Sequence, residues 1–256
     1  MKIMHSLLLA LLGVSLLSTA ASAAEITVSA AISLKEALSA VAKDYESAHA
    51  GAKVVLNFAS SGVLQKQMES GAPVDVFVSA GEKEMNALDQ EDLLAAGTRG
   101  DLLGNTLVLA VPSDSAAVHS LPDLASADVK RIAIGDPKSV PAGQYAQQAL
   151  AWAKLWDVLQ PKLVFAENVR QVLAYVESGN VDAGIVYATD AKASAKVRVA
   201  AGLPEESHAA ITYPAAVLKA SKQQDEARDF LAFLHSETAR AEFVKRGFSV
   251  LDAAAK

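Results

Sequence analysis

The sequence contains no cysteine. Disulfide bonds, thiolate metal sites and cysteine nucleophiles are therefore excluded. The lipid anchor of a bacterial lipoprotein is excluded as well, because that lipid is attached to a cysteine. Basic residues are also scarce: 23 Lys and Arg face 29 Asp and Glu, and the formal net charge is −6. Binding of nucleic acid is not favoured by this balance, because it needs a basic face.

Long apolar runs are absent except near the N-terminus. There, the apolar residues 6–17 follow Lys2 and precede Ala21-Ser22-Ala23, which is the pattern of a secretory signal peptide and its cleavage site. The run is short for a transmembrane helix, so an uncleaved membrane anchor is the weaker alternative. We predict that residues 1–24 are a signal peptide, cut after Ala23 or Ala24. The protein is then expected free in the periplasm or outside the cell, without insertion into the membrane.

Removal of this segment with Lys2 changes the formal net charge from −6 to −7. The field of the whole chain therefore opposes the approach of an anion. If the protein binds an anion, local dipoles and hydrogen-bond donors must hold it.

Runs typical of strands alternate with runs typical of helices through almost the whole chain. This alternation predicts an α/β fold with mainly parallel sheets flanked by helices. One example is the helical pattern of residues 33–48, with apolar residues spaced by three and four positions. The strand-like runs are residues 26–30, 54–59, 75–80, 106–111, 131–135, 163–166, 183–187 and 197–201.

Two of the predicted strands run directly into serine-initiated helices, at Ser33 and at Ser61. A helix start presents free backbone N–H groups, and a serine adds a hydroxyl, so each point suits an anion. Neither turn carries a Lys or Arg. The alternative is a plain helix cap, and the Ser33-x-x-Glu36 spacing fits a capping box, worth about 1 kcal/mol.

Three further positions offer donors at strand ends. Pro141 begins a predicted helix, which leaves the N–H groups of Ala142 and Gly143 without helical acceptors. Asn168 is a suitable helix cap, and Val169 follows it at the first helical position. Tyr187 ends a strand, where its phenol is either an ordinary core side chain or a donor to an acceptor such as an anion.

Five motifs together resemble the periplasmic molybdate-binding proteins of bacterial ABC importers. The resemblance runs from about residue 25 to residue 248. The motifs are Ala31-Ile32-Ser33-Leu34, Phe58-Ala59-Ser60-Ser61-Gly62, the run from Gly71 to Ala80, the run from Gly135 to Gly143, and Gly184-Ile185-Val186-Tyr187.

The resemblance implies a two-lobed type II periplasmic binding fold with the ligand in the cleft. We expect lobe I to comprise residues 25–105 and 214–256, and lobe II to comprise residues 106–213. The two crossing segments should lie near residues 103–109 and 211–216.

The resemblance also implies a set of ligand contacts to molybdate. The residues are Ser33 and Ser61, through side chain and backbone N–H, the backbone N–H groups of Ala142 and Val169, and the hydroxyl of Tyr187. Ser60 could replace Ser61, because the two serines are adjacent. Ile32 departs from the family pattern, in which an alanine is common, and either narrows the site or only repacks the lobe. Arg170 is either a direct ligand or, as we favour, part of a surface or lobe-bridging ion pair.

Molybdate is a tetrahedral dianion that offers only hydrogen-bond acceptors, so a site built of donors suits it. Phosphate near pH 7 keeps a proton and should be rejected where no acceptor is present. Tungstate should bind about as tightly as molybdate. Sulfate has the same charge and shape but is smaller, so only the size of the cavity can distinguish it from molybdate. No cofactor is expected, and molybdenum enters only as the oxyanion. The implied partner is a membrane permease, and the protein should be a monomer.

Other function classes are less well supported. A serine hydrolase would favour a G-x-S-x-G turn, which is absent, and His49, His119, His208 and His235 fall away from the strand ends. No His, Asp and Glu cluster has the spacing of a metal site. We therefore predict a binding protein and not an enzyme. The alternative is a binding protein for sulfate, thiosulfate or another small anion, such as an organic carboxylate.

Overall fold

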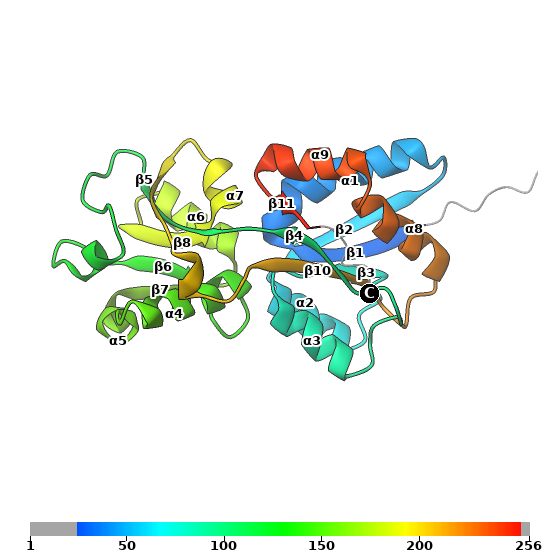
Figure 1. Ribbon diagram of the computed structural model, residues 1–256, viewed down its shortest axis with the longest axis horizontal. Helices are drawn as coiled ribbons and strands as arrows, with labels where there is room; N and C mark the ends of the chain where they lie inside the picture. The colour runs from blue at the N-terminus through cyan, green and yellow to red at the C-terminus, as the bar shows by residue number, and fades with distance from the viewer. Residues whose placement is uncertain (1–24, 252–256) are drawn as a thin grey trace, which may run out of the picture.

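The computed structural model describes residues 25–251. The predicted signal peptide, residues 1–24, lies outside the described residues, as do residues 252–256. Two lobes lie side by side, each built on its own sheet (Figure 1). The expected two-lobed α/β architecture is confirmed.

The first lobe is built on a six-stranded sheet with the order β11-β4-β10-β3-β1-β2. Helices α1, α8 and α9 lie on one side of this sheet, and α2 and α3 lie on the other (Figure 1). Its strands are β1 (Glu25–Ala31), β2 (Lys53–Ala59), β3 (Val76–Val78), β4 (Gly100–Gly104), β10 (Thr212–Val217) and β11 (Ser249–Val250). Its helices are α1 (Lys35–Ala48), α2 (Ser61–Glu69), α3 (Glu82–Gln90), α8 (Gln224–Leu234) and α9 (Glu237–Arg246), with a 3₁₀ turn, η1 (Ile32–Leu34), before α1.

The second lobe is built on a five-stranded sheet with the order β7-β6-β8-β5-β9. Its strands are β5 (Leu107–Pro112), β6 (Ile132–Gly135), β7 (Leu163–Ala166), β8 (Ala183–Tyr187) and β9 (Val197–Gly202). Its helices are α4 (Pro141–Trp152), α5 (Trp156–Leu159), α6 (Val169–Glu177) and α7 (Ala188–Lys192). Short 3₁₀ turns occur at Pro122–Ala125, Gln160–Lys162 and Glu205–Ser207.

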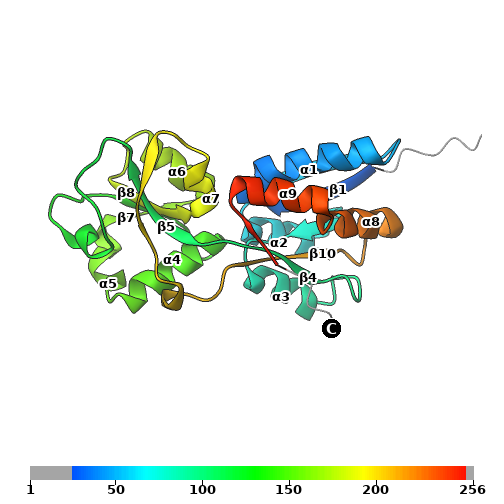
Figure 2. The same ribbon diagram turned by 45° about the horizontal axis from the view of Figure 1, so that its top comes forward.

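The sheets are mixed, whereas the alternation of elements predicted mainly parallel ones. In the first sheet β1 is parallel to β2 and β3, but β10 is antiparallel to both β3 and β4. In the second, β6 is parallel to β7 and β8, but β5 is antiparallel to β8 and β9. The antiparallel strands β5 and β10 are those that enter a sheet after the chain has crossed from the other lobe (Figure 2).

Only the second of the two crossings differs from its predicted position. The first lies between Gly104 in β4 and Leu107 in β5, and the second lies in residues 203–211. Thr212 and Tyr213, which we had assigned to lobe II, pair with Gly104 and Leu103 in the first sheet. A register shift between Tyr213 and Pro214 lets the strand continue through the proline, which cannot donate a ladder hydrogen bond.

The amphipathic pattern of α1 is confirmed, because its apolar stripe is buried: Ala37, Leu38, Val41, Ala42 and Tyr45. Helix α4 begins at Pro141, as predicted, and ends at Trp152. Lys154, two residues later, has a φ of +59°, and the short helix α5 follows. Within residues 25–251, no helix combines the length and the apolar character needed to cross a membrane.

Helix α4 packs closely on β6 at its first turn. A Cβ atom on Gly143 would lie 2.0 Å from the carbonyl oxygen of Gly135, which no side chain tolerates. Glycine at this position therefore sets how near the helix start comes to the end of the strand.

We predict that Gly143→Ala lowers the free energy of unfolding by about 1–3 kcal/mol, because the overlap must be relieved by moving backbone. The gain in helix propensity from Ala, up to about 1 kcal/mol, is smaller. Urea denaturation measures the change. Gly100→Ala is the control, since a Cβ there meets nothing within 4 Å. Equal stability of Gly143→Ala and the parent protein would contradict the packing argument.

Candidate functional site

A small cavity lies between the two lobes, where strands of both sheets end. Its volume is about 10 Å³, the scale of a single water molecule, so it does not have the size of an organic-ligand pocket. Its lining residues are Ala31, Ile32, Ser33, Ala59, Ser60, Ser61, Ala80, Val140, Pro141, Ala142, Val169 and Tyr187. All five residues expected to contact the ligand are therefore brought together, and so are Ser60 and Ile32.

Ser33 reaches the cavity from η1, the 3₁₀ turn between β1 and α1. Its side chain is buried, and its Oγ lies 3.2 Å from the Oη of Tyr213. The capping-box interpretation was wrong, because neither η1 nor α1 has a side-chain cap. The extra 3₁₀ turn moves the start of α1 to Lys35, so Ser33 is inside the turn and not before the helix.

Ser60 and Ser61 lie at the start of α2 and have different partners. The Oγ of Ser61 accepts the N–H of Ala80 at 2.9 Å, which leaves the hydroxyl hydrogen of Ser61 free to donate elsewhere. The Oγ of Ser60 is buried and has no hydrogen-bond partner among the described residues. An unsatisfied buried hydroxyl costs about 1–3 kcal/mol, so a ligand oxygen at this position would be stabilising.

Backbone donors come from the second lobe, at the starts of α4 and α6. Ala142 is the second residue of α4 and Val169 is the first residue of α6, so neither N–H has a helical acceptor. Asn168 caps α6 as predicted, since its side chain accepts the N–H of Gln171. Gly143 was expected to be free but is not, because its N–H donates to the carbonyl of Val140 at 2.9 Å in a tight first turn.

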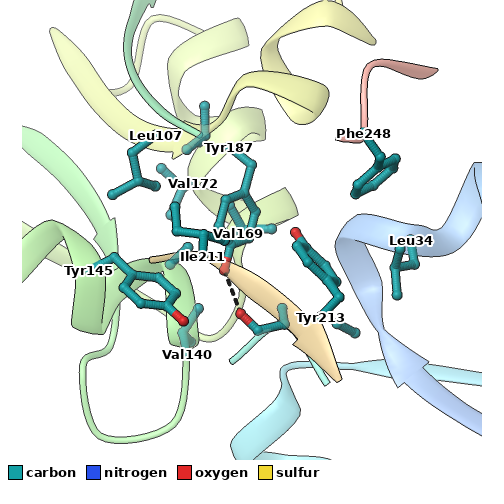
Figure 3. Packing of buried hydrophobic residues seen from close by; sticks show 14 of the residues in the cluster. Leu34, Leu107, Val140, Tyr145, Val169, Val172, Tyr187, Ile211, Tyr213 and Phe248 are labelled. Carbon is teal, nitrogen blue, oxygen red and sulfur yellow. Dashed lines mark hydrogen bonds between the residues drawn. The ribbon is translucent and has the colours of Figure 1, made fainter. Parts of the chain in front are cut away.

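Tyr187 enters from the end of β8 and reaches the first lobe. Its hydroxyl donates to the carbonyl oxygen of Ala80 at 3.2 Å (Figure 3). Burial raises the pKa of Tyr187 well above its ordinary value, so the phenol stays a neutral donor. Tyr213 lies beside it, with ring centroids 5.8 Å apart, and also accepts from Asn105 Nδ2 at 3.1 Å.

No residue lining the cavity carries a charged side chain. Arg170, which the sequence offered as a possible direct ligand, does not line it. One nitrogen of its guanidinium lies 2.5 Å from Glu36 in the first lobe, and another lies 2.7 Å from Asp190 in the second. The lobe-bridging ion pair is therefore confirmed, and the direct-ligand alternative for Arg170 is not supported by its position.

The lobes touch on several sides of the cavity. The N–H of Gly62 in α2 donates to the carbonyl of Ser139 at 3.0 Å, and Gln144 Nε2 donates to Glu84 Oε1 at 2.7 Å. Burial raises the pKa of Glu84, while the bond from Gln144 acts against the rise. The described structure is thus a closed arrangement, in which the lobes contact each other around the cavity.

A scan against family models matches residues 26–249 to the bacterial extracellular solute-binding proteins. A Haemophilus influenzae protein named molybdate-binding protein ModA is 43% identical over 254 residues, which is 97% of each chain. This chain belongs to the bacterial solute-binding family that includes ModA. The resemblance seen in the sequence is confirmed.

Solved structures agree with this family. The Azotobacter vinelandii periplasmic molybdate-binding protein superposes with a TM-score of 0.80 at 26% identity, covering 89% of this chain and all of that one. A substrate-binding domain from Clostridium difficile, assigned to a molybdenum ABC transporter, is 44% identical with a TM-score of 0.70, covering 89% of this chain and 99% of that one. The fold is therefore that of solute-binding proteins.

Sequence reasoning missed two residues that organise the cavity. Ala80 binds Ser61 through its N–H and Tyr187 through its carbonyl, yet its side chain gives no chemical signal. Tyr213 binds Ser33 from β10, but we had placed it in the other lobe. Within residues 25–251, no group of three or more His, Asp and Glu side chains could hold a metal ion.

Asp190 makes the site region sensitive to pH. Burial raises its pKa from the ordinary 3.8 to about 7, while Arg170 acts in the opposite direction. Glu36, Tyr187 and Tyr213 are its other titratable neighbours. Between these two values the folded protein holds a proton that the unfolded chain has released. The contribution to stability is complete below about pH 4 and is lost as the pH rises through about 7.

We therefore expect the parent protein to lose stability relative to Asp190→Asn as the pH rises from 5 to 8, because the amide cannot titrate. Thermal melting of both proteins across this range measures the difference. Parallel curves would show that Asp190 does not change its proton occupancy on folding.

Proposed function

We propose that this protein captures molybdate in the periplasm and delivers it to an ABC permease. The observation that carries the proposal is the closed, uncharged cavity lined by hydroxyls and by free backbone N–H groups. A tetrahedral dianion that only accepts hydrogen bonds fits such a site. Membership in the solute-binding family, with molybdate-binding relatives, supports the same ligand.

In the proposed complex, donors from both lobes surround the oxyanion. Ser33 and Ser61 act through the first lobe, and the N–H groups of Ala142 and Val169 act through the second. Tyr187 adds its hydroxyl. Ser60, whose hydroxyl has no partner among the described residues, is a sixth candidate donor.

The hydrogen bonds suffice for tight binding without a cation. Each hydrogen bond to a charged partner is worth about 1.5–3 kcal/mol, so five to seven give on the order of 10–20 kcal/mol. Lost ligand freedom and ordering of the site take back several kcal/mol. The remainder is enough for a sub-micromolar dissociation constant.

The lining also bears on selectivity. It contains no carboxylate, so the remaining proton of phosphate lacks a charged acceptor, at a cost of about 1–3 kcal/mol. Tungstate has the charge and nearly the size of molybdate and should bind comparably. Sulfate differs only in size, and Ile32, whose atoms border the cavity, helps to set that size.

Delivery to a permease would follow closure of the lobes. We assign residues 25–104 and 212–251 to lobe I and residues 105–211 to lobe II, after the sheets to which their strands belong. Without a cysteine for a lipid anchor, the protein after signal cleavage would diffuse freely in the periplasm as a monomer.

Thermal melting with molybdate, tungstate, sulfate and phosphate at equal concentration tests the ligand. A ligand at 100 times its dissociation constant adds about 2.7 kcal/mol to the free energy of unfolding. We expect large shifts with molybdate and tungstate and a small one with phosphate. If molybdate does not raise the melting temperature, the proposal is rejected. If calorimetry shows that phosphate binds with an affinity within tenfold of that of molybdate, the selectivity argument is rejected.

Serine substitutions test the donors. Ser33→Ala and Ser61→Ala should each weaken molybdate binding by about tenfold to a hundredfold, because each removes a hydrogen bond to a charged ligand. Ser60→Ala, measured in the same titration, shows whether the neighbouring hydroxyl also contributes. Ser29→Ala is the control, since Ser29 is buried in the same lobe but bonds Asn57. Unchanged affinity in the Ser33 and Ser61 variants would remove both from the site.

A further inference from the structure

The ion pairs of Arg170 join three segments that each carry a proposed ligand donor. Glu36 follows Ser33 by three positions, Arg170 directly follows Val169, and Asp190 follows Tyr187 by three positions. These segments are η1 with α1 in the first lobe, and α6 and the end of β8 with α7 in the second. One guanidinium therefore connects donors on both sides of the cavity.

The two halves of this cluster have different environments. The pair between Arg170 Nε and Asp190 Oδ1, at 2.7 Å, lies within the second lobe, and the Asp190 side chain is fully buried. The pair between Arg170 Nη2 and Glu36 Oε2, at 2.5 Å, crosses between the lobes, and the Glu36 side chain is half exposed. The first pair can persist when the lobes separate, whereas the second cannot.

We propose that Glu36 is a positioning residue that latches the closed lobes through Arg170 and thereby slows release of the bound anion. The inference rests on the proposed function. Because Asp190 already holds the guanidinium, little side-chain freedom remains to be lost when Glu36 arrives. This distinguishes the pair from ordinary surface ion pairs, many of which contribute nothing measurable.

The position of the latch fits this role. Glu36 and Arg170 line a cavity of about 170 Å³ between the lobes, and Ser33 borders both this cavity and the smaller ligand cavity. The ion pair thus lies directly beside the ligand cavity without entering it. Since the pair forms only in the closed state, its loss should speed opening and leave capture unchanged.

The latch also explains why Arg170 does not act as a cationic ligand. Two carboxylates face its single charge, so the cluster as a whole is not cationic at pH values where both are ionised. The anion then depends on neutral donors, while the guanidinium of Arg170 is used to hold the lobes.

The test compares Glu36→Ala with the parent protein in dissociation of radiolabelled molybdate, chased with unlabelled molybdate. We expect dissociation to be about two- to fivefold faster, with an unchanged association rate and an unchanged melting temperature without ligand. The difference should shrink at high salt, because the pair is partly exposed. Glu25→Ala is the matched control, since Glu25 pairs with Lys53 within the first lobe, and it should change neither rate.

In a protein that already carries Arg170→Ala, adding Glu36→Ala should not increase the dissociation rate further. If the Arg170→Ala protein does not fold, Arg170→Lys replaces it. In that background, Glu36→Ala should increase the dissociation rate less than it does in the parent protein. An unchanged dissociation rate in Glu36→Ala would overturn the latch. A weaker affinity caused by slower association, and not by faster dissociation, would overturn it as well. If the parent protein itself fails to bind molybdate, the proposed function fails first, and the two outcomes are distinguishable.

Discussion

The structure depends on one electrostatic constraint: polar groups at the ends of several helices and strands must be satisfied inside a closed, uncharged cavity. Free N–H groups at the starts of α4 and α6 cannot bond within their own helices, and Ala142 and Val169, which carry them, are buried. An acceptor-only ligand can satisfy them together. The two lobes, the crossing segments and the tight glycine contact at α4 all serve to bring these donors to one place.

Much of this arrangement was predictable, because it follows from local patterns. Strand ends followed by Ser33, Ser61 or Pro141 marked the donor positions, and parallel strands place such ends at the same edge of a sheet. The cap at Asn168 was also readable, since capping depends on neighbours a few residues away. The sequence could therefore indicate which residues gather, although the contact of each with an anion is still a proposal.

What could not be predicted involves partners far apart in the chain or backbone geometry. The role of Ala80 is carried entirely by its peptide groups, which every residue except proline possesses. Glu36 matched a capping box by spacing, but its actual partner, Arg170, is 134 positions away. The lobe boundary at Tyr213 depended on a register shift at Pro214, which no periodicity reveals. Local rules predict elements, whereas tertiary contacts decide which of two plausible roles a side chain takes.

The hydrogen bond from Tyr187 to Ala80 has a consequence for the energetics of ligand exchange. An oxyanion that receives the phenol's hydrogen takes it from a carbonyl that already holds it, so the number of bonds made by Tyr187 does not increase. The free energy gained by Tyr187 on ligand binding is only the difference between a hydrogen bond to a charged acceptor and one to a neutral acceptor. When the ligand departs, the carbonyl is ready to take the hydrogen back, so the phenol of Tyr187 does not have to wait for water. In the proposed complex, Tyr187 would therefore exchange one hydrogen-bond partner for another without losing a bond.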